Sequence, residues 1–189
     1  MIRCFLAINL SNETERYLSK TINECRPWFG KRVRWVRPEN CHLTLKFLGD
    51  VEESALSSID NAVKGVVSGY KDFEIGLGRA GVFPHQRSPR VLWLGLTGEL
   101  NTLGRLQRDI DLSLAPLGFE PEKRTFVPHI TLGRVKGGRG PLVDIQKFLK
   151  IDPPDLKTHV QKVHLYQSIL KPSGAEYRPL ATFPLKDSQ

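Results

Sequence analysis

A His-x-Thr-Leu motif occurs twice in this chain of 189 residues, as HLTL from His42 and as HITL from His129. The two histidines are 87 residues apart, since 129 minus 42 is 87. The first strand expected in each part of the chain follows the same offset: Phe5 falls opposite Leu92, and 92 minus 5 is also 87. One long period that carries a motif with it indicates a duplicated half-domain. A chain of this length has room for one domain or two closely joined lobes.

Hydrophobic periodicity predicts the same order of elements in both halves. In the first half it predicts strands at 2–10, 32–36, 41–49 and 71–78, with a helix from Ser11 or Asn12 to about Pro27 and another after Asp50. In the second half it predicts strands at 90–96, 126–135 and 159–170, with helices carrying Leu103, Leu106, Ile110 and Leu114, and then Leu142, Ile145 and Phe148. We therefore expect a single domain over 1–189, with half-repeats at roughly 1–85 and 86–175.

The first motif lies on an expected strand, where successive side chains point to opposite faces. His42 and Thr44 therefore share one face. Leu43, Leu45 and Phe47 are expected to pack into the core on the other face.

The second motif presents His129 and Thr131 in the same way. If a pseudo-two-fold axis relates the halves, the two His-Thr pairs face each other across one cleft. An imidazole titrates near pH ~6.5, so one histidine can accept a proton while the other donates one. Each threonine hydroxyl can donate to a phosphoryl oxygen without adding charge. Four such groups around one phosphorus favour in-line displacement, for which we expect no metal and no cofactor.

The chain is basic, with 28 Lys and Arg against 20 Asp and Glu, a net charge of +8 and a pI near 9.6. This charge favours a polyanionic partner, namely nucleic acid or a phosphorylated small molecule, over an unspecialised basic surface. It also predicts salt-sensitive binding to longer RNA. A local cluster supports single-strand binding, because basic residues surround an aromatic ring. Its members are Lys31, Arg32, Arg34 and Arg37 around Trp35.

Cysteine usage indicates a reducing compartment. Cys4, Cys25 and Cys41 are odd in number, lack C-x-x-C spacing and lie in apolar patterns, so we expect buried free thiols. The apolar run near the N-terminus is too short to span a membrane, and no small-residue cleavage site follows it. We therefore expect a cytoplasmic protein that does not bind membranes.

The two motifs, together with "GVFP", "SPRVLWLGL" and "SILKPSGAEYRPLATFPL", resemble the two-histidine (2H) phosphoesterases. More narrowly they resemble the RNA 2',3'-cyclic phosphodiesterases, historically called 2'-5' RNA ligases. The resemblance extends from the first expected strand to the last. It implies an α+β, bilobal, pseudo-symmetric fold, with antiparallel sheets lining a central cleft and helices packed outside.

The resemblance also implies a reaction and its residues. The enzymes of this family open a terminal 2',3'-cyclic phosphate on RNA to leave a 2'-phosphate. By this likeness His42 is the proton donor to the leaving 3' oxygen and His129 the proton acceptor from water, while Thr44 and Thr131 bind the phosphate. Arg134 matches an arginine that the family carries after its second motif. Strict alternation from His129 would point Arg134 away from the phosphate, whereas a bulge at Gly133 would turn it back.

Other uses of these residues stay open. A zinc site would need cysteine or carboxylate ligands close by, and Cys41 is expected on the opposite strand face from His42. The segment GLGRAG, 76–81, matches a dinucleotide-binding pattern but lacks a following helix, so we expect a turn there. Trp35, Trp93 and Phe5 could stack on a base or fill the core. The remaining histidines are expected at the surface or in satisfied core positions, and they are His85, His159 and His164.

Three further functions remain compatible with the sequence. The chain could bind RNA ends without turnover, or it could join RNA ends through a 2'-5' linkage without ATP. It could also act on a small cyclic nucleotide, which requires the same chemistry. We expect a monomer whose partner is RNA with a 2',3'-cyclic phosphate end or such a small cyclic nucleotide.

Overall fold

The computed structural model describes residues 1–137, 145–172 and 174–187. The described strands are β1 (Ile2–Ile8), β2 (Val33–Trp35), β3 (Leu43–Val51), β4 (Phe73–Phe83), β5 (Val91–Gly98), β6 (His129–Val135), β7 (Lys157–Val160), β8 (Lys162–Lys171) and β9 (Gly174–Pro184). The helices are α1 (Asn12–Phe29), α2 (Leu56–Val67), α3 (Leu100–Leu114) and α4 (Ile145–Leu149). Short 3-10 turns lie at 30–32, 38–40, 53–55 and 115–117.

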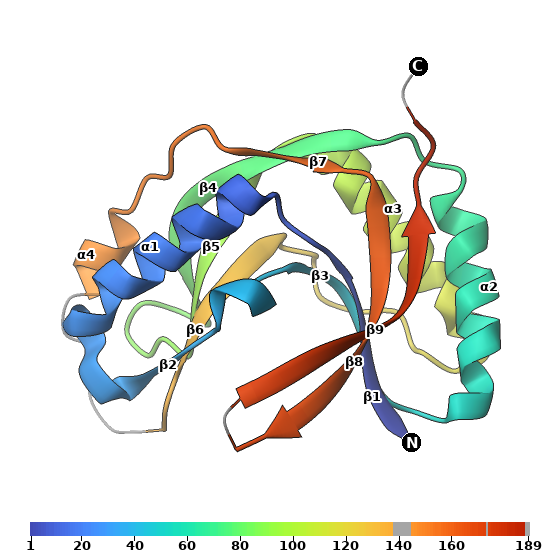
Figure 1. The fold of residues 1–189 in the computed structure, drawn as a ribbon, viewed down its shortest axis with the longest axis horizontal. Helices are drawn as coiled ribbons and strands as arrows, with labels where there is room; N and C mark the ends of the chain where they lie inside the picture. Colours follow the sequence, from blue (N-terminus) through green and yellow to red (C-terminus); the bar gives the residue numbers. More distant parts are fainter. Residues whose placement is uncertain (138–144, 173, 188–189) are drawn as a thin grey trace.

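The strands form one curled antiparallel sheet in the order β7-β4-β5-β6-β3-β1-β8-β9, with β2 also paired to β6 (Figure 1). Strand β6 meets both β3 and β2 along one edge. It pairs with β3 near its start, through Leu43 and Ile130, and with β2 near its end. The sheet therefore opens between β3 and β2, beyond the point where its two lobes join.

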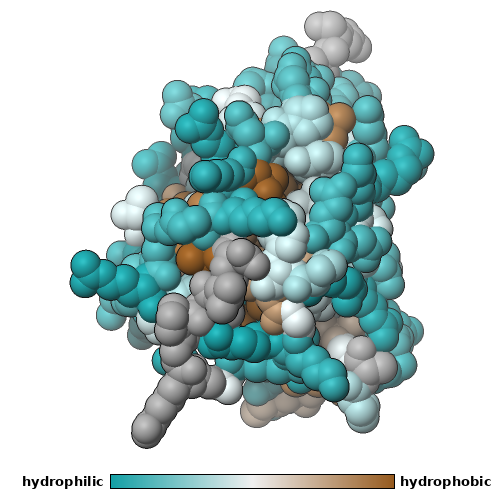
Figure 2. Space-filling view, turned by 90° about the vertical axis from the view of Figure 1, so that its left-hand side faces the viewer, coloured by the Kyte–Doolittle hydropathy of each residue, from teal (hydrophilic) through white to brown (hydrophobic). Residues whose placement is uncertain are grey.

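Helices cover each lobe separately. Helices α2 and α3 pack against each other beside β3 and β9, and α1 and α4 lie at the other lobe, against β2 and β4 (Figure 1). The fold is thus α+β and bilobal, as the family resemblance implied. The face that carries α1 and α4 is mostly hydrophilic, with hydrophobic atoms in small separate areas (Figure 2). Within the described ranges, no helix combines the length and apolarity needed to cross a membrane.

Helix α1 starts as its sequence predicted but ends later. Ser11 is the N-cap, and its hydroxyl accepts a hydrogen bond from the backbone N–H of Thr14. Pro27 lies inside the last turn, and the helix continues to Phe29 before Gly30, whose φ is 51°. The ring of Phe29 packs edge-on against Phe148 of α4, with centroids 6.2 Å apart, which holds the two helices together.

Two expectations for the strands were wrong, and one strand was missed. The segment 76–81, expected as a turn, lies inside β4, because its glycines pair with β5 across a register shift after Leu77. The single strand expected at 159–170 is two strands, since β7 pairs with β4 whereas β8 pairs with β1. Strand β9 was not predicted at all. The helix expected to carry Leu142 is observed as α4, and Leu142 itself lies outside the described residues.

Phe47 does not pack into the core as strict alternation predicted. Strand β3 has an extra residue, Leu45, because Ala7 pairs with Thr44 and Leu6 pairs with Lys46. This bulge turns Lys46 inward and Phe47 toward the face of Thr44. Phe47 is accordingly 64% exposed, whereas Leu45 is 4% exposed.

The 87-residue offset holds for the motif strands but not for their outer neighbours. Phe5 pairs with Phe47, and Val91 pairs with Arg134. Because 134 minus 47 is 87 and 91 minus 5 is 86, the counterpart of Phe5 is Val91 and not Leu92.

Candidate active site

The two motifs meet where the lobes join. Leu43 pairs with Ile130 in the antiparallel ladder between β3 and β6, and both side chains are fully buried on the core face. The residues on either side of this pair therefore point to the opposite face. Antiparallel pairing places His42 beside Thr131 and Thr44 beside His129. The structure thus brings the four predicted residues into one group on one face, His42, Thr44, His129 and Thr131.

Backbone contacts orient the ring of His42. Its Nδ1 lies 2.7 Å from the carbonyl oxygen of Asn40, and because a carbonyl only accepts, Nδ1 carries the proton. The Nε2 atom, 3.0 Å from the hydroxyl of Thr44, is then the acceptor. The ring stacks on Phe5 with centroids 4.9 Å apart and meets the edge of Tyr177 at 5.3 Å.

His129 is held in the same way. Its Nδ1 donates to the carbonyl oxygen of Val127 over 2.7 Å, again two residues before the histidine. Its ring packs against Phe83 and Trp93, with centroids 5.0 and 5.9 Å away. Trp93 fits there because Gly81 has no side chain, since a Cβ at that position would lie 2.2 Å from the tryptophan ring. Both histidines therefore direct Nε2 away from the backbone.

The pKa values of both histidines lie below their ordinary range. Burial lowers the pKa of His42 to about 4, with further lowering by the charges of Arg134 and His129, while the hydrogen bond to Asn40 acts in the opposite direction. Burial and Arg134 also lower the pKa of His129, against the hydrogen bond to Val127. Both rings are therefore neutral near pH 7 in the free protein.

Arg134 points to the same side as the histidines. Trp93 pairs with Thr131 and Val91 pairs with Arg134, so Leu132 is an extra residue in β6. This bulge reverses the alternation after Thr131 and turns Arg134 toward the cleft. The sequence suggested such a bulge at Gly133, and its extra residue is the preceding Leu132. The neighbouring Gly133 allows the close approach of β2, because a Cβ there would lie 2.6 Å from the side chain of Val33.

A pocket of about 530 Å³ opens beside His42, where the sheet separates between β3 and β2. The aromatic rings that contact His42 form its inner wall, and residues of β2 and of the β8–β9 hairpin complete it. Among the described residues that line it, the charged side chains are all arginines, namely Arg3, Arg34, Arg37 and Arg134. Arg34 and Arg37 belong to the basic cluster predicted from the sequence.

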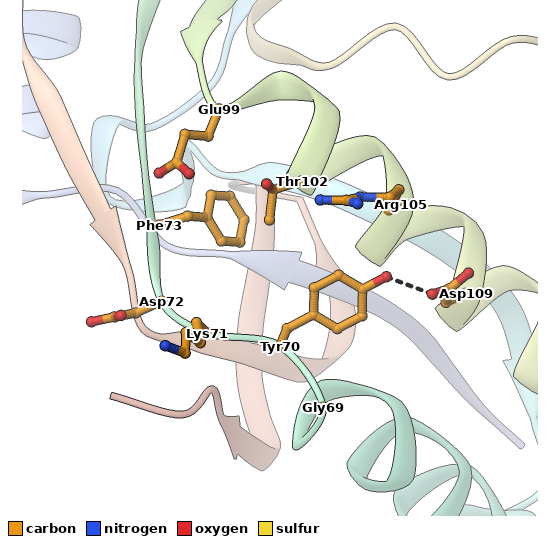
Figure 3. Close-up of a pocket in the computed structure, with 9 residues that line it drawn as sticks. All are labelled: Gly69, Tyr70, Lys71, Asp72, Phe73, Glu99, Thr102, Arg105 and Asp109. Carbon is orange, nitrogen blue, oxygen red and sulfur yellow. Dashed lines mark hydrogen bonds between the residues drawn. The ribbon is translucent and has the colours of Figure 1, made fainter. Parts of the chain in front are cut away.

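A hollow of about 600 Å³ lies elsewhere, between the end of α2, the start of β4 and α3 (Figure 3). Its charges are of both signs, and the Tyr70 hydroxyl donates to Asp109 across it (Figure 3). The lining residues are Gly69, Tyr70, Lys71, Asp72, Phe73, Glu99, Thr102, Arg105 and Asp109, none of which belongs to the motifs. Of the two pockets, the one of about 530 Å³ adjoins the motif group, because Phe5 and Tyr177 line it and contact His42.

The alternative uses of histidine and cysteine find little support. Within residues 1–137, 145–172 and 174–187, no three His, Cys, Asp or Glu side chains gather as metal ligands would. Cys4, Cys25 and Cys41 are free and buried, as predicted, and burial raises the pKa of the Cys41 thiol to about 12. His159 contacts Asp72 at 2.8 Å and His164 contacts Thr182 at 3.0 Å. Neither of these histidines takes part in the motif group.

Comparison with known proteins agrees with this geometry. A family model described as LigT like phosphoesterase matches residues 8–93 and again residues 94–177. The chain belongs to the LigT-like phosphoesterase family. The 2H phosphoesterase resemblance drawn from the motifs is therefore confirmed.

Individual members of the family match over nearly the whole chain. A Methanothermobacter thermautotrophicus protein named RNA 2',3'-cyclic phosphodiesterase is 39% identical, over 97% of this chain and 99% of its own. A Thermus thermophilus crystal structure matches with a TM-score of 0.82 at 27% identity and covers 100% of both chains. E. coli LigT complexed with 3'-AMP matches with a TM-score of 0.76 at 26% identity, over 97% of this chain and 98% of its own.

Sequence reasoning missed several residues around this LigT-like site. Tyr177 comes from the unpredicted strand β9, and Phe47 was assigned to the core. Arg3 lies on the strand expected at 2–10, which the sequence predicted to be buried, so Arg3 was not identified as a site residue. For Phe5 and Trp93 the sequence left open whether the rings stack on a base or fill the core. In the structure both rings pack against the histidines.

Proposed function

We propose that this protein hydrolyses the terminal 2',3'-cyclic phosphate of RNA to a 2'-phosphate by acid and base catalysis between two histidines. The pairing of Leu43 with Ile130 carries the proposal, because it sets both His-Thr pairs side by side on one face. Relatives in the family that bear the name RNA 2',3'-cyclic phosphodiesterase support the choice of substrate. One chain supplies both pairs, so a monomer suffices for the site.

In this proposal water attacks the phosphorus of the cyclic ester and the bond to the 3' oxygen breaks. His129 accepts the proton of the water through Nε2, and His42 donates a proton to the leaving 3' oxygen. The hydroxyls of Thr44 and Thr131 donate to the phosphoryl oxygens, and the guanidinium of Arg134 offsets their charge.

The assignment of the two roles follows the family resemblance, because burial lowers the pKa of both histidines, that of His42 to about 4. Both imidazoles are neutral near pH 7 in the free protein, so the donor gains its proton when substrate binds. A bound phosphate anion favours the charged form of His42 and thus prepares the donor.

The test is turnover of an oligonucleotide with a 2',3'-cyclic phosphate end in excess EDTA, followed by separation of the 2'- and 3'-phosphate products. We expect a 2'-phosphate and full activity with the chelator. His42→Ala and His129→Ala should each lower kcat by about 10²–10⁴-fold, the usual contribution of general acid or base catalysis. His164→Ala, a histidine outside the motif group, is the matched control and should keep its activity. Activity that required metal or survived both motif substitutions would refute the proposal, and binding without product would leave an RNA-end-binding module.

A further inference from the structure

The cleft contains more positive charge than one reacting phosphate requires. In the proposed function Arg134 serves that phosphate, which leaves Arg3, Arg34 and Arg37 in the same pocket. Arg34 lies directly opposite Arg134 in the pairing of β2 with β6. Like charges directly opposite each other on adjacent strands are unfavourable. The arrangement is therefore expected where anions occupy the space above the two strands.

No aspartate or glutamate is among the described residues that line the pocket, although Glu176 lies close enough to Lys171 and Arg37 for these charges to lower the pKa of its carboxyl. Asp50 is the cross-strand partner of Arg3, yet among the described residues no carboxylate forms an ion pair with Arg3, Arg34 or Arg134. By contrast, the hollow between α2, β4 and α3 is lined by both acidic and basic side chains (Figure 3).

The size and the aromatic content of the pocket indicate a nucleotide unit and not an isolated anion. Its volume of about 530 Å³ exceeds the space of one phosphate. The ring of Phe47, 64% exposed, lines the same pocket as the arginines, and the ring of Tyr177 also lines it. Basic grooves with exposed rings are how proteins hold single-stranded nucleic acid, since bases stack on the rings while phosphates meet the cations.

We propose that this pocket binds the phosphate on the 5' side of the terminal nucleoside, so that the substrate is recognised through two phosphates. Arg34 of β2 and Arg3 of β1 bind the second phosphate. This proposal rests on the proposed function for the position of the first phosphate. It makes RNA ends, which carry that 5' phosphodiester, better substrates than nucleoside cyclic phosphates with a free 5' hydroxyl.

The kinetic test compares adenosine 2',3'-cyclic phosphate with the same nucleotide carrying a 5'-phosphate. We expect kcat/KM to be at least about tenfold higher for the 5'-phosphorylated substrate, since a hydrogen bond to a charged group is among the stronger polar contacts. In Arg34→Gln this ratio should fall close to one. Arg26→Gln, which removes the same charge from the exposed face of α1, is the matched control and should keep the wild-type ratio. A wild-type ratio near one, or an unchanged ratio in Arg34→Gln, would overturn the proposal.

Calorimetry with product analogues separates this proposal from the proposed function. Adenosine 2',5'-bisphosphate should bind the wild-type protein at least about tenfold more tightly than adenosine 2'-phosphate, and Arg34→Gln should remove the difference. If neither cyclic substrate is hydrolysed but this difference in affinity is found, the second phosphate site stands and the proposed function fails. If hydrolysis occurs but both analogues bind equally, the proposed function stands and the second phosphate site fails.

Discussion

Phe47 and Arg134 are equivalent residues of the two halves, each three positions after the motif threonine and each following a bulge. The extra residue is Leu45 in β3 and Leu132 in β6, and 132 minus 45 is again 87. The same backbone device thus brings an aromatic ring to one side of the cleft and a guanidinium to the other. Two halves with similar histidines thereby acquire different surroundings, which an asymmetric substrate requires.

The exposure of Phe47 has a measurable effect on stability. Phe47→Ala should change the free energy of unfolding by less than about 1 kcal/mol, because the ring is 64% exposed and leaves no cavity. Phe5→Ala is the matched control in the same cross-strand pair, and it should cost about 3–5 kcal/mol, because that ring is 2% exposed. Urea denaturation of both variants provides the comparison. Equal costs would mean that Phe47 packs in the core, as strict strand alternation predicts.

At the level of elements, one buried ion pair connects β3 to α3 and to the segment that precedes β6. Lys46 of β3 contacts Asp111 of α3, and both side chains are less than 10% exposed, at 8% and 9%. Lys46 also donates to the carbonyl oxygen of Glu120 over 2.8 Å, and Asp111 accepts from the backbone N–H of Glu122 over 2.8 Å. These bonds hold the segment that leads into His129 against the strand that follows His42.

Loss of this contact should be costly. Asp111→Ala leaves the Lys46 ammonium buried without its partner and should lower the free energy of unfolding by about 3–5 kcal/mol. Asp109→Ala on the same helix is the matched control, and loss of its partly exposed hydrogen bond to Tyr70 should cost about 1 kcal/mol. Urea denaturation at constant pH measures both. Similar values for the two variants would show that the ion pair does not hold the segment in place.

The local patterns of the sequence were enough to predict most elements and the core of the site. Alternation and helical spacing identified β1, β3, β6 and the apolar faces of α2 and α3, and the repeat paired the two motifs. What they could not predict depends on partners distant in sequence. Strands β7 and β8 are separate because β7 pairs with β4 whereas β8 pairs with β1. Lys46 is buried because Asp111, 65 residues away in sequence, neutralises its charge. The extra residues at Leu45 and Leu132 likewise become visible only in the register with the adjacent strand.

For the whole molecule, the lobes act together on the protonation of the site. Each lobe contributes one histidine, and the apolar rings of that lobe contribute to its desolvation. Arg134 adds a positive charge that lowers both pKa values. The free protein therefore keeps both imidazoles neutral near pH 7, although the proposed reaction requires one of them to be charged. Binding of an anionic substrate and catalysis are coupled through this shared electrostatic field.

This coupling predicts the pH dependence of kcat/KM, which reports the free enzyme. The reactive form carries one proton on the pair. We expect a bell-shaped profile with its maximum on the acid side, above the pKa of about 4 for His42 and below the ordinary histidine value of 6.5. Above that range kcat/KM should fall about tenfold per pH unit, as the pair loses its last proton.

Substitution of Arg134 tests the electrostatic origin of that profile. Removal of its charge in Arg134→Gln raises the pKa of both histidines, so both limbs of the profile should move to higher pH, in addition to any loss of phosphate binding. Arg134→Lys keeps the charge and should leave the limbs near their wild-type positions even if the rate falls. The measurement is kcat/KM from pH 4 to 9 at constant ionic strength. If the limbs stayed in place in Arg134→Gln while the rate fell, Arg134 would act on the phosphate alone and not through the histidines.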